Sequence, residues 1–245
     1  MFATRTSLQN TLHAKKPLAC RFSLLVWNLH KENQTEAFEK KFHALMQSYP
    51  SDILLFQEVK YPKKSTFFFH KHAYFLAANI ETKHHCYGVC TATNFALEAI
   101  QNRRTTKKEL GFITHKSLLI TKHQICSNKT LHIVNLHAIN FVSHKIFADE
   151  LKKITTTIAK LDGALIVAGD FNNWSKKRFA LLQAFQKELS LEKLEPENPH
   201  HIKRIFSQEI DHIYYRGIKV LRAEAIDTKD ISDHNPLYAE FELVL

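Results

Sequence analysis

The stretch Ala164-Leu165-Ile166-Val167-Ala168-Gly169-Asp170-Phe171-Asn172-Asn173-Trp174 decides the fold that we expect for this chain. Its apolar run from Leu165 to Ala168 has the length and branching of a strand that is buried on both faces. The run ends at Gly169 and leads to Asp170 and Asn172, whose side chains point the same way if the extended geometry continues. A carboxylate and an amide would then leave the end of a rigid core strand together, which suits a functional site. The alternative is a strand closed by an Asx-type turn that carries no chemistry.

The composition is that of a globular protein with an excess of positive charge. The chain has 245 residues, of which 44% are hydrophobic and 24% are charged. Thirty-four Lys and Arg against 24 Asp and Glu give a net charge of +10. Such a surface favours a polyanion or an anionic membrane, although solubility alone can also explain it. We expect a flexible arm over residues 1–20 and a single domain over residues 21–245.

The cysteines and the hydropathy pattern predict a reduced, cytoplasmic protein. Cys20, Cys86, Cys90 and Cys126 show neither a CxxC pair nor the regular spacing of a disulfide framework or zinc site. Reduced thiols are therefore the expectation. No apolar run resembles a signal peptide or reaches the length of a membrane span, and export by an unrecognised route stays open. We expect a monomer.

Strand and helix patterns alternate along the chain. A strand at 22–27, a helix that begins at a capping box of Asn33 and Glu36, and a strand at 52–56 predict parallel pairing with a right-handed crossover. Helices are also expected at 146–161 and after Ser175. Further strands are expected at 73–78, 86–93, 117–122, 131–136, 210–215, 219–225 and 237–245, with 219–225 pairing back on 210–215 as a hairpin.

Three basic segments allow two interpretations each. Residues 60–72 mix aromatic with basic side chains, and an amphipathic helix that buries its phenylalanines is favoured over a surface for nucleic acid or lipid. Residues 101–108 predict a polar loop, either merely solvated or facing phosphate. Lys176, Lys177 and Arg178 crowd the first turn of a helix, where cations oppose the helix dipole, and this indicates an anion nearby.

Polar residues recur where the expected strands end. Asn28, Glu58, His137 and the Asp170/Asn172 pair follow four strands, and Asp233-His234 opens the last one. Each residue alone is explained by a solvated cap or a hydrogen-bonded spacer. Together they supply hard oxygen ligands for a divalent metal, amides for a phosphate and imidazoles that move protons at neutral pH. This set of groups suits the hydrolysis of phosphate esters.

The same residues carry a resemblance to a known family. The chain resembles the endonuclease/exonuclease/phosphatase superfamily over residues 22–245. The resemblance implies a deoxyribonuclease-I-like, four-layered α/β sandwich, in which two mixed sheets pack face to face with helices outside. The blocks that carry it are Trp27-Asn28, Phe56-Gln57-Glu58, Asn135-Leu136-His137, Gly169-Asp170-Phe171-Asn172, Ile210-Asp211-His212 and Ser232-Asp233-His234-Asn235-Pro236.

The resemblance also implies roles for single residues. Glu58 would be the principal ligand of Mg²⁺, with Mn²⁺ as an alternative, beside Asn28 and Asp233. His234, oriented by Asp211, would activate the attacking water, although Asp170 stays open as the base. The other implied roles are positioning of the nucleophile and scissile phosphate by Asp170 and Asn172, and contact of the phosphate or the leaving oxygen by His137. Because some members have a carboxylate where this chain has His30, we expect one metal ion.

The substrate is predicted less firmly than the reaction. Dispersed cations favour a nuclease acting on DNA or RNA. A phospholipid or inositol phosphate phosphodiesterase is the first alternative, with residues 67–69 at its membrane edge. A non-catalytic module that binds nucleic acid is the second. The residues expected to bind substrate are Arg103, Arg104, Asn140, Lys176 and Arg204.

Overall fold

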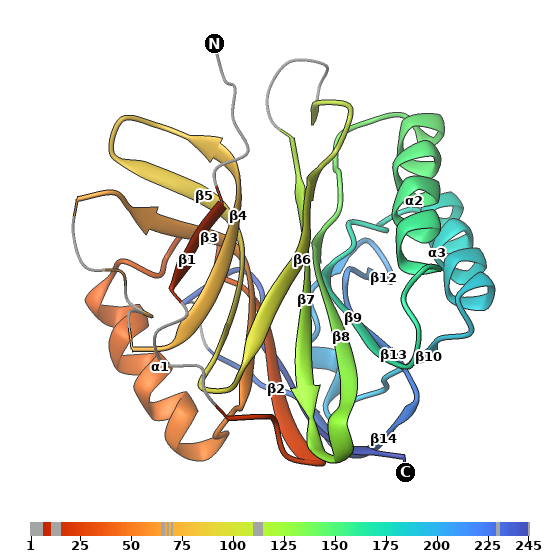
Figure 1. Ribbon diagram of the computed structural model, residues 1–245. Coiled ribbons are helices and arrows are strands. Elements are labelled where there is room, and N and C mark those ends of the chain that lie inside the picture. The colour runs from red at the N-terminus through yellow and green to blue at the C-terminus, as the bar shows by residue number, and fades with distance from the viewer. Residues whose placement is uncertain are drawn as a thin grey trace.

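The computed structural model describes residues 7–10, 16–64, 67, 69, 71–109, 115–228 and 231–244. Two β-sheets pack face to face, with α1 outside one sheet and α2 and α3 outside the other (Figure 1). The expected four-layered sandwich is therefore confirmed. Among the described residues, the α-helices are α1 (Glu36–Ser48), α2 (His144–Ile158) and α3 (Lys176–Glu188), and 3₁₀ turns include Cys126–Asn128 and Pro199–His201.

Both sheets are mixed. The seven-stranded sheet has the order β1-β4-β5-β3-β2-β15-β14, and the six-stranded sheet has the order β10-β13-β9-β8-β7-β6. β2 with β3 and β8 with β9 are the parallel pairs within these sheets. The strands of the first sheet are β1 (Ser7–Asn10), β2 (Arg21–Asn28), β3 (Ile53–Pro62), β4 (Ala73–Glu81), β5 (His85–Thr93), β14 (Ile218–Ala225) and β15 (Leu237–Leu243). Those of the second are β6 (Leu97–Arg104), β7 (Ser117–Ile125), β8 (Lys129–His137), β9 (Ala164–Asp170), β10 (Glu192–Lys193) and β13 (Asp211–Arg216).

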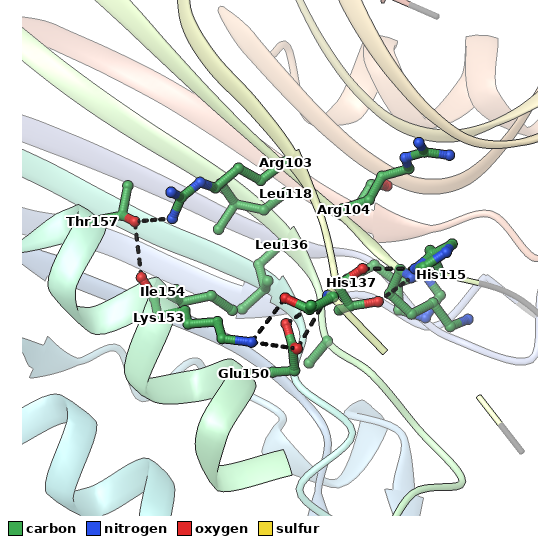
Figure 2. Close-up of a pocket in the computed structure, with 15 residues that line it drawn as sticks. Arg103, Arg104, His115, Leu118, Leu136, His137, Glu150, Lys153, Ile154 and Thr157 are labelled. Carbon is green, nitrogen blue, oxygen red and sulfur yellow. Dashed lines mark hydrogen bonds and ion pairs between the residues drawn. The ribbon is translucent and has the colours of Figure 1, made fainter. Parts of the chain in front are cut away.

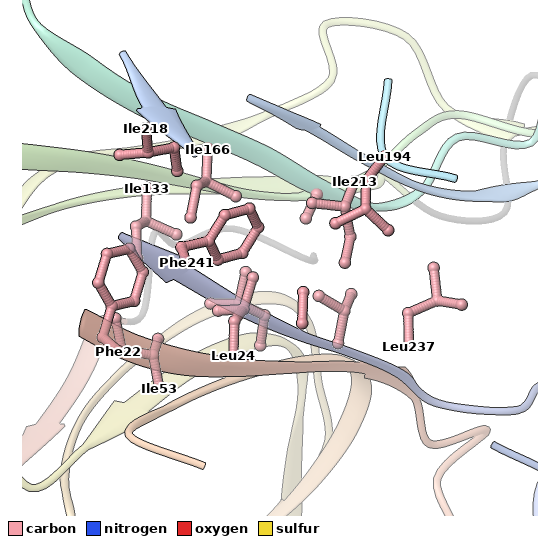
Figure 3. Packing of buried hydrophobic residues seen from close by; sticks show 14 of the residues in the cluster. Phe22, Leu24, Ile53, Ile133, Ile166, Leu194, Ile213, Ile218, Leu237 and Phe241 are labelled. Carbon is pink, nitrogen blue, oxygen red and sulfur yellow. The ribbon is translucent and has the colours of Figure 1, made fainter. Parts of the chain in front are cut away.

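The apolar faces of the two sheets form the central core. Ile133, Ile166 and Ile213 of one sheet face Phe22, Leu24 and Ile53 of the other (Figure 3). All seven residues of β9 are buried, as its uninterrupted apolar sequence predicted. A second cluster joins α1 to the first sheet, and a third joins α2 and α3 to the second.

Several local predictions are wrong. The helix α1 is capped by Thr35, whose hydroxyl accepts from the Phe38 N–H, while Asn33 instead exchanges two hydrogen bonds with the backbone of Lys60. β3 runs on to Pro62, so residues 60–62 are strand and not helix. Phe67 and Phe69 are nevertheless buried, as the favoured interpretation required, and Phe68 lies outside the described residues.

The hairpin predicted between 210–215 and 219–225 does not form. Gly217, with φ +70°, turns the chain after β13, and β14 then joins the opposite sheet, where it pairs with β15. The segment 101–104, predicted as loop, lies in the edge strand β6. An edge strand can carry this polar sequence because only one of its sides is paired.

The described parts of residues 1–20 contact the folded domain. Ser7–Asn10 pairs with β4, and Leu18 is buried in the central core, so the described part of residues 1–20 is not a loose arm. Cys20 and Cys126 form a disulfide with a Cα–Cα distance of 5.3 Å, which corrects the expectation of four reduced thiols. Cys86 and Cys90 are free and buried. In the described part of the chain, no helix is long and apolar enough to cross a membrane.

Candidate active site

The parallel pair β8–β9 sets the first two side chains of the site side by side. His137 is the register partner of Asp170, and its Nε2 lies 3.4 Å from Asp170 Oδ2. This pairing depends on Gly169, which has φ +137° and whose hydrogen faces the carbonyl of Leu136, so that a Cβ would overlap this oxygen. Only glycine adopts such a backbone readily. The glycine that ends the apolar run therefore permits the close approach of the two strands.

A β-bulge aims Glu58 at the same place. The register between β3 and β5 shifts between Phe56 and Val59, and Glu58 within this bulge has φ +51°. A bulge redirects a side chain out of the regular alternation of a strand. Glu58 Oε1 lies 3.8 Å from His137 Nε2. The predicted strand end at Glu58 is thus an irregularity inside a longer strand, but the delivery of the carboxylate to the site is as expected.

His234 and Asp211 form a close, buried pair in the site. Nδ1 of His234 lies 2.7 Å from Asp211 Oδ2, and its Nε2 lies 3.9 Å from Asp170 Oδ2. Asp211 opens β13, where it is the register partner of Asp170 on β9. The backbone oxygen of His234 also accepts from the indole of Trp27 at 2.8 Å, which fixes the loop. All three polar groups, Asp170, Asp211 and His234, are at most 5% exposed.

Burial and neighbouring charges set the protonation of this cluster. Burial alone would lower the pKa of His234, but Asp211 and then Asp170 raise it to about 9. Burial raises the pKa of Asp170 to about 6, against the opposing effect of His234. The pKa of His137 lies well below its ordinary value because the ring is buried and faces Lys116.

Glu58 stays ionised because cations surround it. Its carboxylate lies 2.9 Å from Lys31 Nζ and 3.6 Å from Lys116 Nζ. Burial alone would raise its pKa, but His137, Lys116 and Lys31 together lower it to about 2. Sequence reasoning missed Lys31 and Lys116, since nothing in a chain with 34 Lys and Arg distinguishes these two from the rest.

Asn28, Asn172 and Asp233 complete the group that the sequence predicted. Asn28 donates to Asp170 Oδ2 at 3.1 Å, and the backbone N–H of Asn172 donates to Asp170 Oδ1 at 3.0 Å. Oδ1 of Asp233 lies 3.7 Å from His234 Nε2, while its other oxygen pairs with Lys203, a residue that the prediction did not include. Residues from six separate segments thus meet at one end of the sandwich.

Three of the five residues expected to bind substrate already contact other residues of the protein. Asn140 Oδ1 accepts from the indole of Trp174, Arg103 contacts Thr157, and Arg204 pairs with Glu209. Lys176 is exposed. Figure 2 shows Arg104 directed away from Arg103, as alternation along β6 requires.

Arg178 faces the protein interior, where burial lowers its pKa to about 10 and the carboxylate of Glu109 opposes this change. It is fully buried and donates hydrogen bonds to the carbonyls of Asn172 and Val142 at 2.9 Å. Its guanidinium packs 4.5 Å from the ring centroid of Phe147 and 4.7 Å from that of Trp174. Arg178 therefore holds two loops of the site together.

The donor groups fit a hard divalent cation. Ligand atoms of Asp170, Asp211 and His234 lie within 4.8 Å of one another. Glu58, Asn28 and Asp233 offer a second set of oxygen atoms, and Glu58 Oε2 receives no hydrogen bond of good geometry despite its ion pair with Lys31. Carboxylate and amide oxygens are the ligands that Mg²⁺ takes in proteins.

Two facing mixed sheets with a buried Asp/His cluster at one end define a phosphoesterase of the deoxyribonuclease-I-like fold. A model of the "Endonuclease/Exonuclease/phosphatase family" matches residues 25–234. The chain belongs to this family, and it is a metal-dependent phosphoesterase in which Asp170, Asp211 and His234 form a candidate metal site.

Solved structures share the fold at low sequence identity. A family protein from Leptotrichia buccalis C-1013-b is 17% identical with a TM-score of 0.68, and the match covers 91% of this chain and 100% of that one. The human Nocturnin catalytic domain with bound sulfate is 16% identical with a TM-score of 0.65 over 98% and 97% of the two chains. The endonuclease domain of TRAS1, a telomere-specific non-LTR retrotransposon, is 16% identical with a TM-score of 0.58 over 91% and 99%.

Proposed function

We propose that the protein is a Mg²⁺-dependent nuclease that hydrolyses phosphodiester bonds of DNA or RNA by in-line attack of water. The observation that carries this proposal is the Asp211–His234 pair, at 2.7 Å, placed beside Asp170. A carboxylate on Nδ1 fixes the orientation of the imidazole and leaves Nε2 toward the reacting groups.

Each residue then has a defined task. Nε2 of His234 receives the proton of the attacking water, Asp211 orients the ring, and Asp170 and Asn172 position the water and the scissile phosphate. His137, between Glu58 and Asp170, contacts a phosphate oxygen. Of the two sets of donor atoms, we assign Mg²⁺, with Mn²⁺ as an alternative, to Glu58, Asn28 and Asp233, because in the other set Asp211 already pairs with Nδ1 of His234. When bound, the cation would stabilise charge on the non-bridging oxygens and offset the carboxylates that otherwise raise the pKa of His234.

A cationic cavity beside His137 supports a substrate with several phosphates. The cavity has a volume of about 320 Å³ and lies between β6, β7 and α2. Arg103, Lys116 and Lys153 line it, and Lys153 is held by the buried carboxylate of Glu150 at 3.0 Å (Figure 2). Repeated phosphates gain most from such dispersed cations, and the net charge of +10 acts in the same direction.

The phospholipid alternative has less support at its expected membrane edge, residues 67–69, of which Phe68 lies outside the described residues. Phe67 and Phe69 were expected to form this edge, but they are 3% and 0% exposed and pack in the core with α1. Aromatic side chains that are already buried cannot insert into a bilayer. Nucleic acid is therefore the substrate class that we propose.

The disulfide supports a proposal about the compartment. A Cys20–Cys126 bond is stable in oxidising compartments and is uncommon in the cytoplasm. We therefore propose that the protein acts in an oxidising compartment, in place of the cytoplasmic location expected from cysteine spacing.

The test is a hydrolysis panel with a matched pair of variants. Single-stranded DNA, plasmid, RNA, sphingomyelin vesicles and inositol phosphates are incubated with the protein in Mg²⁺ or EDTA. We expect Mg²⁺-dependent cleavage of a nucleic acid, a loss of about 1,000-fold for His234→Gln, and no loss for the exposed His200→Gln. Hydrolysis confined to sphingomyelin or inositol phosphates would contradict the assigned substrate.

A further inference from the structure

Two phenylalanines beside the active site are exposed to solvent. Phe141, four residues after His137, is 61% exposed, and Phe206, in the turn between β11 (Arg204–Ile205) and β12 (Gln208–Glu209), is 85% exposed. Exposed apolar side chains are common singly, but a group of aromatics at the edge of a site marks a binding surface. With the half-buried Trp174, we call Phe141 and Phe206 the aromatic rim.

The backbone at both phenylalanines is unfavourable as well. Phe141 has φ +40° and Phe206 has φ +55°. Glycine or asparagine adopts this left-handed region readily, whereas a bulky residue does so at a cost. Side chains this exposed gain little burial to offset the strain of their own backbone. Such residues cluster at ligand-binding sites, where contact with the ligand, and not with the core, offsets the strain.

The ring of Trp174 and the backbone of Phe141 share one hydrogen-bond partner. The indole N–H of Trp174 donates to Asn140 Oδ1 at 2.8 Å, and the backbone N–H of Phe141 donates to the same oxygen at 2.9 Å. Arg178 packs against the Trp174 ring at 4.7 Å. Asn140, predicted to bind substrate, is therefore a positioning residue for two of the three aromatics.

Phe206 completes the rim from the opposite segment. Its ring centroid lies 6.2 Å from that of Trp174, with an interplanar angle of 56°. The hairpin that carries it leads directly into Asp211, and the Phe171 N–H donates to the Ile210 carbonyl at 2.8 Å beside it. Trp174 in turn follows Asn172 by two residues. The rings thus lie on segments that continue into the cluster of Asp170, Asp211 and His234.

We propose that the aromatic rim stacks on the bases of an unpaired nucleic-acid strand and thereby directs single-stranded substrate to the site. The inference rests on the proposed nuclease function and names its preferred substrate. Aromatic platforms beside cationic surfaces bind single strands, because every base has a face on which a ring can stack and the phosphates contact the cations. Exposed Lys176 and Lys177 follow Trp174 after one residue, Ser175, and provide such cations.

The surroundings of the rim favour nucleic acid over a lipid surface. Each ring has a polar residue on at least one side in sequence, namely Asn140, Ser175 and Ser207, although Val142 and Ile205 stand on the other side of Phe141 and Phe206. A membrane-inserting surface needs a continuous apolar patch, whereas rings separated by polar groups suit separate bases along a phosphate chain. Lipid binding is accordingly an outcome that the experiment must be able to detect.

The test compares strands with and without bases, in EDTA so that no hydrolysis occurs. Fluorescence anisotropy measures the affinity for a 12-nucleotide single strand and for a 12-unit chain of base-free tetrahydrofuran phosphates of equal charge. We expect the wild-type protein to bind the base-containing strand about tenfold more tightly. Phe206→Ala and Phe206→Leu should abolish most of this preference without changing the affinity for the base-free chain. Phe206→Trp, which keeps a ring, should retain it.

The controls separate this inference from the proposed function. Leu221→Ala removes an apolar side chain that is 40% exposed on β14 and should change neither affinity. Equal binding of both probes by the wild-type protein, or an unchanged preference in Phe206→Ala, overturns the proposal. The proposal is also overturned if Phe206→Ala loses binding to phosphatidylcholine/phosphatidylserine vesicles but keeps its binding to the oligonucleotide. A preference for the base-containing strand without any Mg²⁺-dependent cleavage would instead contradict the nuclease function, while base stacking by the aromatic rim would remain supported.

Discussion

Gly169→Ala tests whether the close approach of β8 and β9 assembles the site. A Cβ at this position would overlap the carbonyl oxygen of Leu136, and φ +137° is a region that other residues avoid. The backbone strain costs about 1 to 3 kcal/mol. Relief of the overlap must move the strands apart by on the order of 1 Å, and a displacement of this size at a catalytic group costs roughly 100-fold in rate. We therefore expect a loss of about 3 to 5 kcal/mol in the free energy of unfolding and about 100-fold in kcat/KM.

Gly163→Ala is the matched control. Gly163 also has positive φ, at +79°, but the nearest atom to an added Cβ is the Thr130 carbonyl oxygen at 3.8 Å, in ordinary contact. This variant carries backbone strain without overlap, so it should lose about 1 kcal/mol and no activity. Urea denaturation gives the free energies, and phosphodiester hydrolysis gives kcat/KM. If Gly169→Ala were as stable and as active as Gly163→Ala, the reasoning that strand proximity places His137 beside Asp170 would be refuted.

Three further predictions concern stability. Reduction of the Cys20–Cys126 disulfide, which closes a separation of 106 residues, should lower the free energy of unfolding by about 2 to 4 kcal/mol, and an unchanged urea midpoint in dithiothreitol would refute this. Burial, reinforced by His132, lowers the pKa of His123 in the folded protein to about 3, so between pH 6.5 and 3 the unfolded chain binds the extra proton and stability falls with falling pH. At pH 5 the loss is about 2 kcal/mol relative to pH 7, and His123→Gln but not the exposed His84→Gln should reduce this acid sensitivity in denaturant titrations. Arg178→Met should cost about 3 kcal/mol because it leaves buried carbonyls without donors, whereas exposed Lys177→Met should cost almost nothing; equal melting temperatures for the two variants would contradict the role given to Arg178.

The parts of the fold that the sequence predicted are those with strong local signals. The uninterrupted apolar run of β9 and the helical periodicity of α2 identify their elements because burial imposes the pattern on each residue. The Ser175 cap of α3 was also recognisable, since its hydroxyl accepts from the backbone N–H of Arg178 as expected. The ordered polar blocks at strand ends then placed the chain in its family.

The errors lie where tertiary contacts override local preference. β6 is a polar edge strand whose sequence is also that of a loop. β14 follows β13 after a glycine turn typical of a hairpin, yet it crosses to the other sheet because its partner there is β15. The disulfide joins cysteines 106 residues apart, and no local spacing predicts such a pair.

The residues of the site also divide into those that the sequence predicted and those that only the packed structure identifies. The polar blocks supplied Glu58, Asp170, Asp211 and His234, because each of these residues lies in or close to a strand that the sequence pattern predicted, although Glu58 occupies a bulge inside its strand and not its end. The cations that neutralise them, Lys31, Lys116 and Lys203, could not be selected from sequence, since only the packed structure distinguishes them from other lysines. The sequence showed that Arg178 stands in the first turn of a helix, but it did not show that the side chain is buried, and Arg178 was therefore assigned to a nearby anion.

The most direct test of the central claim is Mg²⁺-dependent cleavage of a fluorescently labelled single-stranded oligonucleotide by Glu58→Gln. The substitution removes the charge of Glu58 and keeps its size, and exposed Glu39→Gln on α1 serves as the control. We expect the wild-type protein and the control to cleave in Mg²⁺ and not in EDTA, and Glu58→Gln to lose about 1,000-fold in rate while its melting temperature stays near that of the wild type. Full Mg²⁺-dependent activity of Glu58→Gln would show that the residues gathered at this end of the sandwich do not perform the reaction proposed for them.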